Sequence, residues 1–211
     1  MNEASSIGPL VTAVRLHAPT IFVVDDGSED GTRKAAESAG ARVLRHEMSQ
    51  GKGAALQSGW RCALDSGFGW ALSLDGDGQH APDDIPAFFG CAEQTSAALV
   101  VGNRMVEAAK MPLVRRMVNR WMSRRLSKLT GQTLPDSQCG FRLMHLPTWA
   151  GLRLETQNFE IESEVLVAFL KAGHKVEFVP VRAIYKTEQS KIHPVRDSLR
   201  WWRWWRRARG R

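Results

Sequence analysis

The sequence predicts an α/β domain built around a mostly parallel sheet. Short apolar, β-branched segments alternate along the chain with amphipathic segments of helical length. Glycine or proline stands at several of the boundaries, and acidic residues directly follow two of the predicted strands. The chain contains no internal repeat and no low-complexity linker. We therefore predict one domain, residues 1–194, followed by a short tail, residues 195–211.

The predicted strands are short runs in which apolar residues are continuous or alternate with polar ones. In chain order they are 20–25 (TIFVVD), 41–46 (ARVLRH), 70–74 (WALSL), 97–101 (AALVV) and 174–181 (HKVEFVPV). The segments between them have helical periodicity, and they are 29–39, 52–66, 83–91, 112–130, 160–172 and 195–208. Gly40, Gly67 and Gly173 follow three of these helices, as glycine commonly does after a last helical turn. Ligands of open α/β sheets bind beyond the carboxyl ends of strands, where acidic residues stand here.

Composition excludes several protein classes. A chain of 211 residues that is 43% hydrophobic and 24% charged has the make-up of a globular domain. Three cysteines in a chain of this length do not make a disulfide framework, which favours a reducing compartment. No apolar run is long enough to cross a membrane, and the N-terminus lacks a signal-peptide pattern. We expect neither an integral membrane protein nor a secreted mini-protein.

Most of the formal charge of +7 lies in the tail. Seven arginines and one aspartate give residues 196–211 a charge of +6, and four of the eight tryptophans are also there. On a helical wheel Trp201, Trp202, Trp204 and Trp205 gather on one side and most of the arginines on the other. This distribution is typical of a helix at an anionic membrane surface. A membrane-protein partner is the first alternative, and the body offers no motif that favours nucleic acid.

An oxygen-rich motif, LDGDGQH, follows the predicted strand at 70–74. Asp75 and Asp77 are two residues apart, and the amide of Gln79 comes two residues later. Hard cations such as Mg²⁺ or Mn²⁺ prefer carboxylate and carbonyl oxygens, so this spacing suits a metal site. A polar turn after a strand is the simpler alternative.

Two further motifs suit contact with a nucleotide. Asp25 and Asp26 end the first predicted strand, where a carboxylate can accept hydrogen bonds from a base or a ribose hydroxyl. The alternative there is a helix N-cap at Ser28 or Asp30. GKGAAL at 51–56 places a lysine between glycines at a helix start, which suits an anion. Its spacing is not that of a Walker loop, and the chain has no GxGxxG motif.

Together these motifs resemble the family 2 glycosyltransferases of the GT-A fold, most of all the branch that transfers sugars to polyprenol and dolichol phosphates. The resemblance covers nearly the whole chain in order. It rests on NEASSIGPLV (2–11), VVDDGSEDGT (23–32), GKGAALQSG (51–59), LDGDGQH (74–80), GNR (102–104), DSQCGFR (136–142), FEIESEVL (159–166), KVEFVPV (175–181) and SKI (190–192). It implies a Rossmann-like sheet flanked by helices, and inverting transfer of a sugar from a GDP- or UDP-sugar.

The resemblance also implies roles for individual residues. Asp75, Asp77 and Gln79 would hold Mg²⁺ or Mn²⁺ on the donor pyrophosphate, whose charge grows as the bond to the sugar breaks. The predicted contacts of the nucleotide-sugar are Glu3, Asp25, Asp26, Lys52, Gly53, Asp75, Gly76 and Asp77. Arg104 and Lys191 would contact the donor or acceptor phosphates and stabilise developing charge. The predicted catalytic set is Asp77, Arg104, Asp136 and Lys191.

A phosphate acceptor is already an oxyanion, so it requires orientation more than a general base. Arg116 and Arg120 stand one turn apart in the predicted basic helix and suit a lipid phosphate. A solvated basic face is the alternative for each of them. For a hydroxyl acceptor, Asp136, Glu160 or Glu162 could act as base, whereas Asp136 could instead order arginines around a phosphate.

One departure from the family pattern concerns the first strand. Relatives usually carry a buried strand before Asn2-Glu3, and here Met1 stands directly before this pair. We expect two neighbouring strands to be left with unpaired backbone groups and the natural start to lie upstream. The leading prediction is a transferase that is cytoplasmic and peripheral at the inner face of the membrane. The alternatives are transfer to a saccharide hydroxyl in cell-envelope polysaccharide synthesis, or a truncated, inactive membrane-associated binding module.

Overall fold

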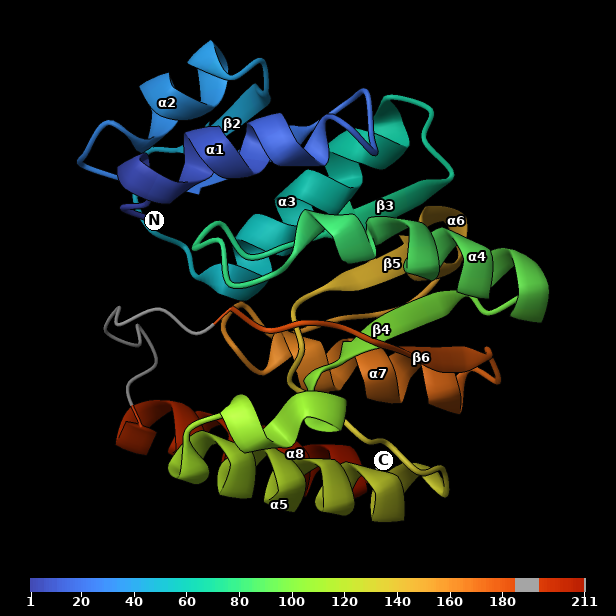
Figure 1. Ribbon diagram of the computed structural model, residues 1–211. Coiled ribbons are helices and arrows are strands. Elements are labelled where there is room, and N and C mark those ends of the chain that lie inside the picture. Colours follow the sequence, from blue (N-terminus) through green and yellow to red (C-terminus); the bar gives the residue numbers. More distant parts are fainter. Residues whose placement is uncertain (185–193, 211) are drawn as a thin grey trace.

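Strands form two separate sheets in the part of the chain that the computed structural model describes, residues 1–184 and 194–210, of which 194–196 are described by their backbone alone (Figure 1). In the first sheet β1 (Phe22–Asp26) pairs in parallel with β2 (Arg42–His46). The second sheet has the order β3-β5-β4-β6. Its strands are β3 (Trp70–Ser73), β4 (Leu99–Asn103), β5 (Arg142–His145) and β6 (Val176–Pro180).

The second sheet is more mixed than the sequence predicts. β4 and β6 are parallel, but β5 runs antiparallel to both β3 and β4. β5 was not predicted, because it is only four residues long and two of them, Arg142 and His145, are polar. Within the described residues β1 pairs with β2 and β3 pairs with β5, each on one side, as the other end strands β2 and β6 also do. That a further strand would pair with β1 and β3 stays a prediction.

Helices cover the sheets on both faces. They are α1 (Ala4–Val14), α2 (Thr32–Ser38), α3 (Lys52–Asp65), α4 (Ile85–Thr95), α5 (Leu113–Thr130), α6 (Leu146–Ala150), α7 (Ile161–Lys171) and α8 (Pro194–Arg209). Two 3₁₀ segments, η1 (Pro82–Asp84) and η2 (Arg104–Lys110), precede α4 and α5. The predicted helices are confirmed except for their ends, whereas α1 and α6, which contain proline, were not predicted.

Helix α3 lies between the two sheets and touches both (Figure 1). On the β1 side, Gly59 has no side chain, and a Cβ there would meet Val24 Cγ2 at 3.1 Å. On the β3 side, Trp60 Nε1 donates a hydrogen bond of 2.8 Å to Ser73 Oγ. The start of α3 is therefore held in a fixed position relative to both sheets.

The core lies between the four-stranded sheet and the helices α4 and α7. Phe88, Phe141 and Phe169 are fully buried there, and the rings of Phe88 and Phe141 lie 4.3 Å apart. A second, smaller cluster of apolar side chains joins α5, α7 and α8. The described C-terminal segment is thus part of the folded body.

Helix α8 turns part of its tryptophan face inward, onto α5 and α7. Trp201 and Trp204 are only 2% and 6% exposed, and they pack with Leu126 and Val167. Trp201 Nε1 also donates a hydrogen bond of 2.8 Å to Ser163 Oγ. The expectation that this whole face meets a membrane is therefore wrong for these two tryptophans, because an apolar surface of the body covers them. That residues 195–211 form a separate unit stays a prediction.

Replacement of Trp201 by alanine tests this packing. The change leaves a cavity and removes one of the two hydrogen bonds that Ser163 Oγ accepts, so we expect a loss of about 3–5 kcal/mol in the free energy of unfolding. Trp202→Ala on the same helix is the matched control. Its side chain is 43% exposed, so we expect a loss of about 1 kcal/mol or less. Urea unfolding measures both, and equal losses would contradict the burial of Trp201.

Candidate functional site

A partly buried cluster of charges forms where α3, the loop after β3 and α7 meet. Lys52 Nζ lies 2.7 Å from Asp75 Oδ1 and 2.6 Å from Glu162 Oε1. Burial alone would lower the pKa of Lys52, but the two carboxylates outweigh it and raise the pKa. Burial alone would likewise raise the pKa of Asp75, but Lys52 and His80 hold that pKa well below its ordinary value. The ion pair between Lys52 and Asp75 therefore favours the charged form of both groups.

Two glycines permit the close packing around this cluster. A Cβ on Gly140 would lie 2.8 Å from Asp75 Oδ2, so only glycine lets this loop pass the carboxylate. A Cβ on Gly53 would lie 2.7 Å from the backbone carbon of Gln157. Gly53 is thus required by packing against the 156–158 loop, and its predicted contact with a nucleotide stays a prediction.

Asp77 differs from Asp75 in that no lysine or arginine of residues 1–184 and 197–210 forms an ion pair with it, although His80 favours its ionised form. Its Oδ1 accepts a hydrogen bond of 3.0 Å from the backbone N–H of Gln79. Burial raises the pKa of Asp77, and the carboxylates of Asp75 and Glu3 add to this effect. A divalent cation near Asp77 would favour its ionised form and would offset the crowding of acids.

The predicted metal ligands fit a cation only in part. Asp77 fits for the reason given above, and Gln79 has a side-chain oxygen that accepts a long contact of 3.4 Å from Arg115 Nη1. Asp75 is already engaged by Lys52 and His80. In the described segments no group of three or more His, Cys, Asp or Glu side chains is arranged to hold a metal ion.

The two acids at the end of β1 have different surroundings. Both oxygens of Asp26 are occupied by the 46–51 loop: Ser49 Oγ and the backbone N–H groups of Gln50 and Gly51 donate to it, and His46 Nδ1 lies 2.8 Å away. Burial opposes these contacts, but together they lower the pKa of Asp26. Asp25 Oδ1 accepts from the backbone of Ser28, whereas its buried Oδ2 has no hydrogen-bond partner among residues 1–184 and 197–210. Asp25 therefore has the free acceptor that a nucleoside contact requires.

The beginning of α1 is tied to the loop that carries Asp75 and Asp77. Ser6 Oγ donates to the carbonyl of Gly76 at 2.9 Å and lies 3.1 Å from Glu3 Oε2. The backbone N–H of Glu3 donates to Thr32 Oγ1 at 2.7 Å. The predicted donor-site residues Glu3 and Gly76 are thus brought to the same place as the acidic cluster.

Arg104 and Asp136 form a second buried ion pair. Arg104 Nε and Nη2 donate to the two oxygens of Asp136 at 2.8 and 2.9 Å, and the Arg104 backbone N–H donates at 3.1 Å. Asn119 Nδ2 donates at 2.8 Å to the same carboxylate. Burial would raise the pKa of Asp136, but Arg104 outweighs it and lowers the pKa. A fully paired, ionised carboxylate orients Arg104 and is a poor general base.

The basic helix α5 contributes three arginines with different surroundings. Arg115 reaches Gln79, as described above, and Arg116 Nη1 donates to the carbonyl of Ala108 at 3.3 Å. Arg120 is exposed one turn further along. The prediction singled out Arg116 and Arg120 but not Arg115 or Asn119, although the helical spacing from 112 to 119 could have indicated both. Lys191, the remaining predicted site residue, lies outside the described residues.

Replacement of Asp77 by asparagine tests the acid crowding. Because the pKa of Asp77 is higher in the folded protein than in the unfolded chain, its ionisation opposes folding once the pH exceeds the unfolded value. We expect the variant to gain about 1 kcal/mol or less at neutral pH and to lose this gain below about pH 3. Urea unfolding at the two pH values measures it, with Asp83→Asn, whose side chain is 77% exposed, as control. A less stable variant at neutral pH would contradict the crowding.

Comparison with known proteins relates this site to a family. The description Glycosyl transferase family 2 matches residues 1–147. The chain is 31% identical over 212 residues to the UDP-N-acetylglucosamine–dolichyl-phosphate N-acetylglucosaminyltransferase of Methanococcus voltae, covering 90% of this chain and 84% of that one. It is 28% identical over 194 residues to the undecaprenyl-phosphate mannosyltransferase of Micrococcus luteus, covering 85% and 79%.

A solved structure has a similar fold. It is glucosyl-3-phosphoglycerate synthase of Mycobacterium tuberculosis in complex with Mn²⁺, UDP-glucose and phosphoglyceric acid. The TM-score is 0.70 at 20% identity, over 94% of this chain and 71% of that chain. This likeness confirms the predicted fold, and the family description covers more than half of the sequence. The chain therefore belongs to glycosyltransferase family 2 and is a glycosyltransferase with the GT-A fold.

Proposed function

We propose that this glycosyltransferase moves a sugar from a UDP- or GDP-sugar to a polyprenyl or dolichyl phosphate, with Mg²⁺ or Mn²⁺ as cofactor. The observation that carries the choice of acceptor is an exposed apolar row on α5. Leu113, Val114 and Met117 are 65%, 76% and 68% exposed, and Val118 and Trp121 continue the row. The row begins beside the cations of the site, so an acceptor with a charged head and an apolar chain fits both.

The donor side of the proposal rests on the acidic cluster and Asp25. The unpartnered Oδ2 of Asp25 is suited to accept a hydrogen bond from a nucleoside. Asp77 and Gln79 are the residues that would hold the cation. A bound Mg²⁺ or Mn²⁺ would neutralise charge on the departing nucleoside diphosphate. Two protein cations border this place: Arg115, which contacts Gln79, and Lys52, which is held between Asp75 and Glu162.

The acceptor side rests on the Arg104–Asp136 pair. Asp136 fixes the guanidinium of Arg104 in one orientation, and Arg115 and Arg116 lie at the beginning of the neighbouring helix. Preorganised donors of this kind can align a phosphate oxygen and stabilise the charge that shifts between two phosphates. Because a phosphate is already anionic, the reaction requires no carboxylate to remove a proton. The pairing of Asp136 and Glu162 with cations is consistent with that requirement.

The proposed location is the surface of a membrane at its cytoplasmic face. No helix within residues 1–184 and 194–210 is long and apolar enough to span a membrane. An exposed apolar row flanked by arginines suits contact with a lipid surface instead. The cysteines Cys62, Cys91 and Cys139 are all free, which suits a reducing compartment. The acceptors named for the two relatives, dolichyl and undecaprenyl phosphate, are membrane lipids and support this choice.

A second candidate is transfer to a saccharide hydroxyl, and one observation favours it. Burial raises the pKa of Glu160, and its buried Oε2 has no hydrogen-bond partner in the described segments, as a general base would require. Glu160→Gln separates the candidates. It should leave transfer to a lipid phosphate nearly unchanged, whereas a hydroxyl acceptor would make it lose most activity.

The role of Asp136 can be tested with Asp136→Asn, which removes the charge that aligns Arg104. We expect kcat to fall about 100-fold or more. The acidic limb of the pH–rate profile should stay in place, because the lowered pKa of Asp136 keeps it ionised over the assay range. Arg104→Lys should show the same pattern, and the exposed change Asp65→Asn should have no effect. Loss of the acidic limb in Asp136→Asn would identify Asp136 as a base and contradict the positioning role.

The donor and cofactor can be tested by thermal unfolding with UDP, GDP and their sugar conjugates, with and without Mn²⁺. A ligand at about 100 times its dissociation constant adds roughly 2.7 kcal/mol, so we expect a clear rise with one nucleotide that depends on metal. Transfer of radiolabelled sugar to polyprenyl phosphate then tests the acceptor. No rise with any nucleotide, in a protein that unfolds cooperatively, would contradict the proposed function and favour an inactive binding module.

A further inference from the structure

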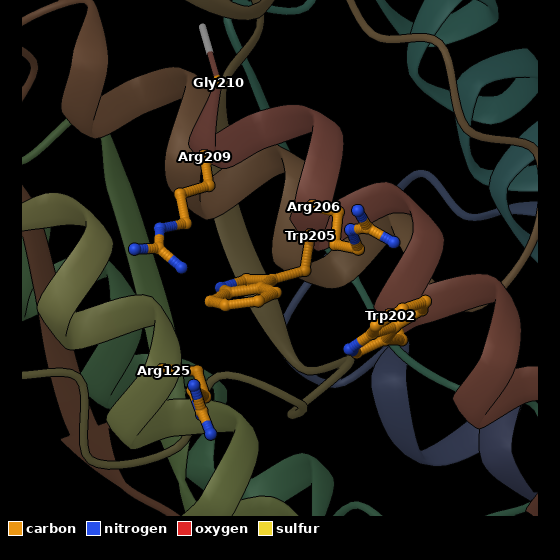
Figure 2. A pocket seen from close by; sticks show the side chains of 6 residues that line it. All are labelled: Arg125, Trp202, Trp205, Arg206, Arg209 and Gly210. Carbon is orange, nitrogen blue, oxygen red and sulfur yellow. The ribbon is translucent and has the colours of Figure 1, made fainter.

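A basic groove lined by indole rings lies between α5 and the C-terminal half of α8 (Figure 2). Its volume is about 530 Å³, and its lining residues are Arg125, Trp202, Trp205, Arg206, Arg209 and Gly210. Arg125 stands ten residues after Arg115 on α5, a rise of about 15 Å at 1.5 Å per residue. The groove is therefore separate from the proposed acceptor site.

The arginines of the groove are held in place by indole rings. The Arg125 guanidinium lies 5.3 Å from the centre of the Trp205 ring and 5.4 Å from that of Trp121. Arg209 lies 5.7 Å from the Trp205 ring, and Arg206 lies 4.8 Å from the Trp202 ring. Figure 2 shows Arg209 and Arg125 on opposite sides of the Trp205 ring. These cation–π contacts hold one guanidinium on each side of the Trp205 ring, so both charges border the edge of that ring.

All the side-chain polar groups of the groove are hydrogen-bond donors. No carboxylate in residues 1–184 and 197–210 pairs with Arg125, Arg206 or Arg209, and no acidic residue lines the groove. The indole Nε1 of Trp205 is buried and has no hydrogen-bond partner within the described part of the chain. Buried donors are nearly always satisfied in folded proteins, so this one indicates a missing acceptor. A ligand with several anionic oxygens would serve the indole and the guanidinium groups together.

The surroundings of the groove favour a lipid as the source of this anion. Trp202, 43% exposed, lines one side. Trp121, 45% exposed, stacks on Arg125 and ends the apolar row of α5. A phosphate bound in the groove would therefore have apolar surface on the side where acyl chains would lie.

We propose that this groove binds the phosphate of an anionic phospholipid headgroup. Arg125, Arg206, Arg209 and Trp205 Nε1 contact its oxygens, while the row on α5 contacts the acyl region. The inference rests on the proposed location at a membrane but not on the transfer reaction. Such a site fixes the far end of α5 on the lipid surface and sets how the acceptor end faces it.

Vesicle binding by the full chain tests the proposal. Vesicles of phosphatidylcholine with phosphatidylglycerol are compared with vesicles of phosphatidylcholine alone, and the full chain is expected to bind only the former tightly. The double variant R206Q/R209Q removes two groove arginines. The control R203Q/R207Q removes two exposed arginines of the same helix that do not line the groove.

The two double variants lose the same charge, so a general electrostatic attraction would weaken both equally. We expect R206Q/R209Q to lose roughly tenfold more affinity for the anionic vesicles than R203Q/R207Q. Trp205→Phe, which keeps an aromatic ring but removes the N–H, should also weaken binding more than Trp202→Phe. Equal losses in the matched pairs would overturn the proposal.

A second arm separates a lipid headgroup from free phosphate. Inorganic phosphate is titrated into the protein without vesicles, and thermal unfolding is followed. The lipid assignment would be overturned by two results together. Phosphate would stabilise the parent protein but not R206Q/R209Q, and both double variants would bind vesicles equally well. The groove would then be assigned to a soluble phosphate. Metal-dependent nucleotide binding is measured on the same variants and should be unchanged. Its absence from the parent protein would refute the proposed function without changing the vesicle result.

Discussion

The arrangement of the site depends on one interaction, the double ion pair that the ammonium group of Lys52 forms with Asp75 and Glu162. The three residues come from the start of α3, the loop after β3 and the first turn of α7. Because the two sheets of the described chain do not pair with each other, contacts of α3 and of the beginning of α1 set the relative position of these elements. Burial of charges is costly, and a partner that is removed leaves the others unpaired. A substitution of Lys52 would therefore disturb both the charge balance and the geometry of the whole site.

Neighbouring acids in this molecule differ in pKa or in hydrogen-bond partners because their surroundings differ. Asp75 has Lys52 as partner and a lowered pKa, whereas Asp77, two residues later, has a raised pKa. In the same way Asp26 is saturated with donors from the 46–51 loop, while Asp25 keeps one oxygen without a partner. In each pair one acid is engaged by groups of the protein, and the other is the one that we propose for a ligand. This division is how one short acidic motif can serve structure and chemistry at once.

Much of the fold could be predicted from the sequence, but the contacts of the site could not. The basic helix was predicted at 112–130 and found at Leu113–Thr130, because its periodicity is long and unbroken. β5 was not predicted, since four residues that include a buried Arg142 carry no periodic signal, and that arginine is held by backbone carbonyls. The family of the chain was recognised from its motifs. The saturation of Asp26 and the pairing of Asp136 with Arg104 depend on residues distant in sequence, so no local pattern could indicate them.

The inward position of Trp201 and Trp204 changes what the arginine-rich end of the chain does. If α8 were removed, the side chains of Leu126, Leu134 and Val167 would be exposed to solvent, because Trp201 and Trp204 now cover them. A protein without α8 would then associate with itself or with any apolar surface. Its binding to vesicles would therefore say nothing about specific lipid recognition. Because α8 packs against α5 and α7, its exposed arginines have fixed positions relative to the rest of the protein. Their charges keep a fixed geometry relative to α5, which is a condition for selectivity and not only for attraction.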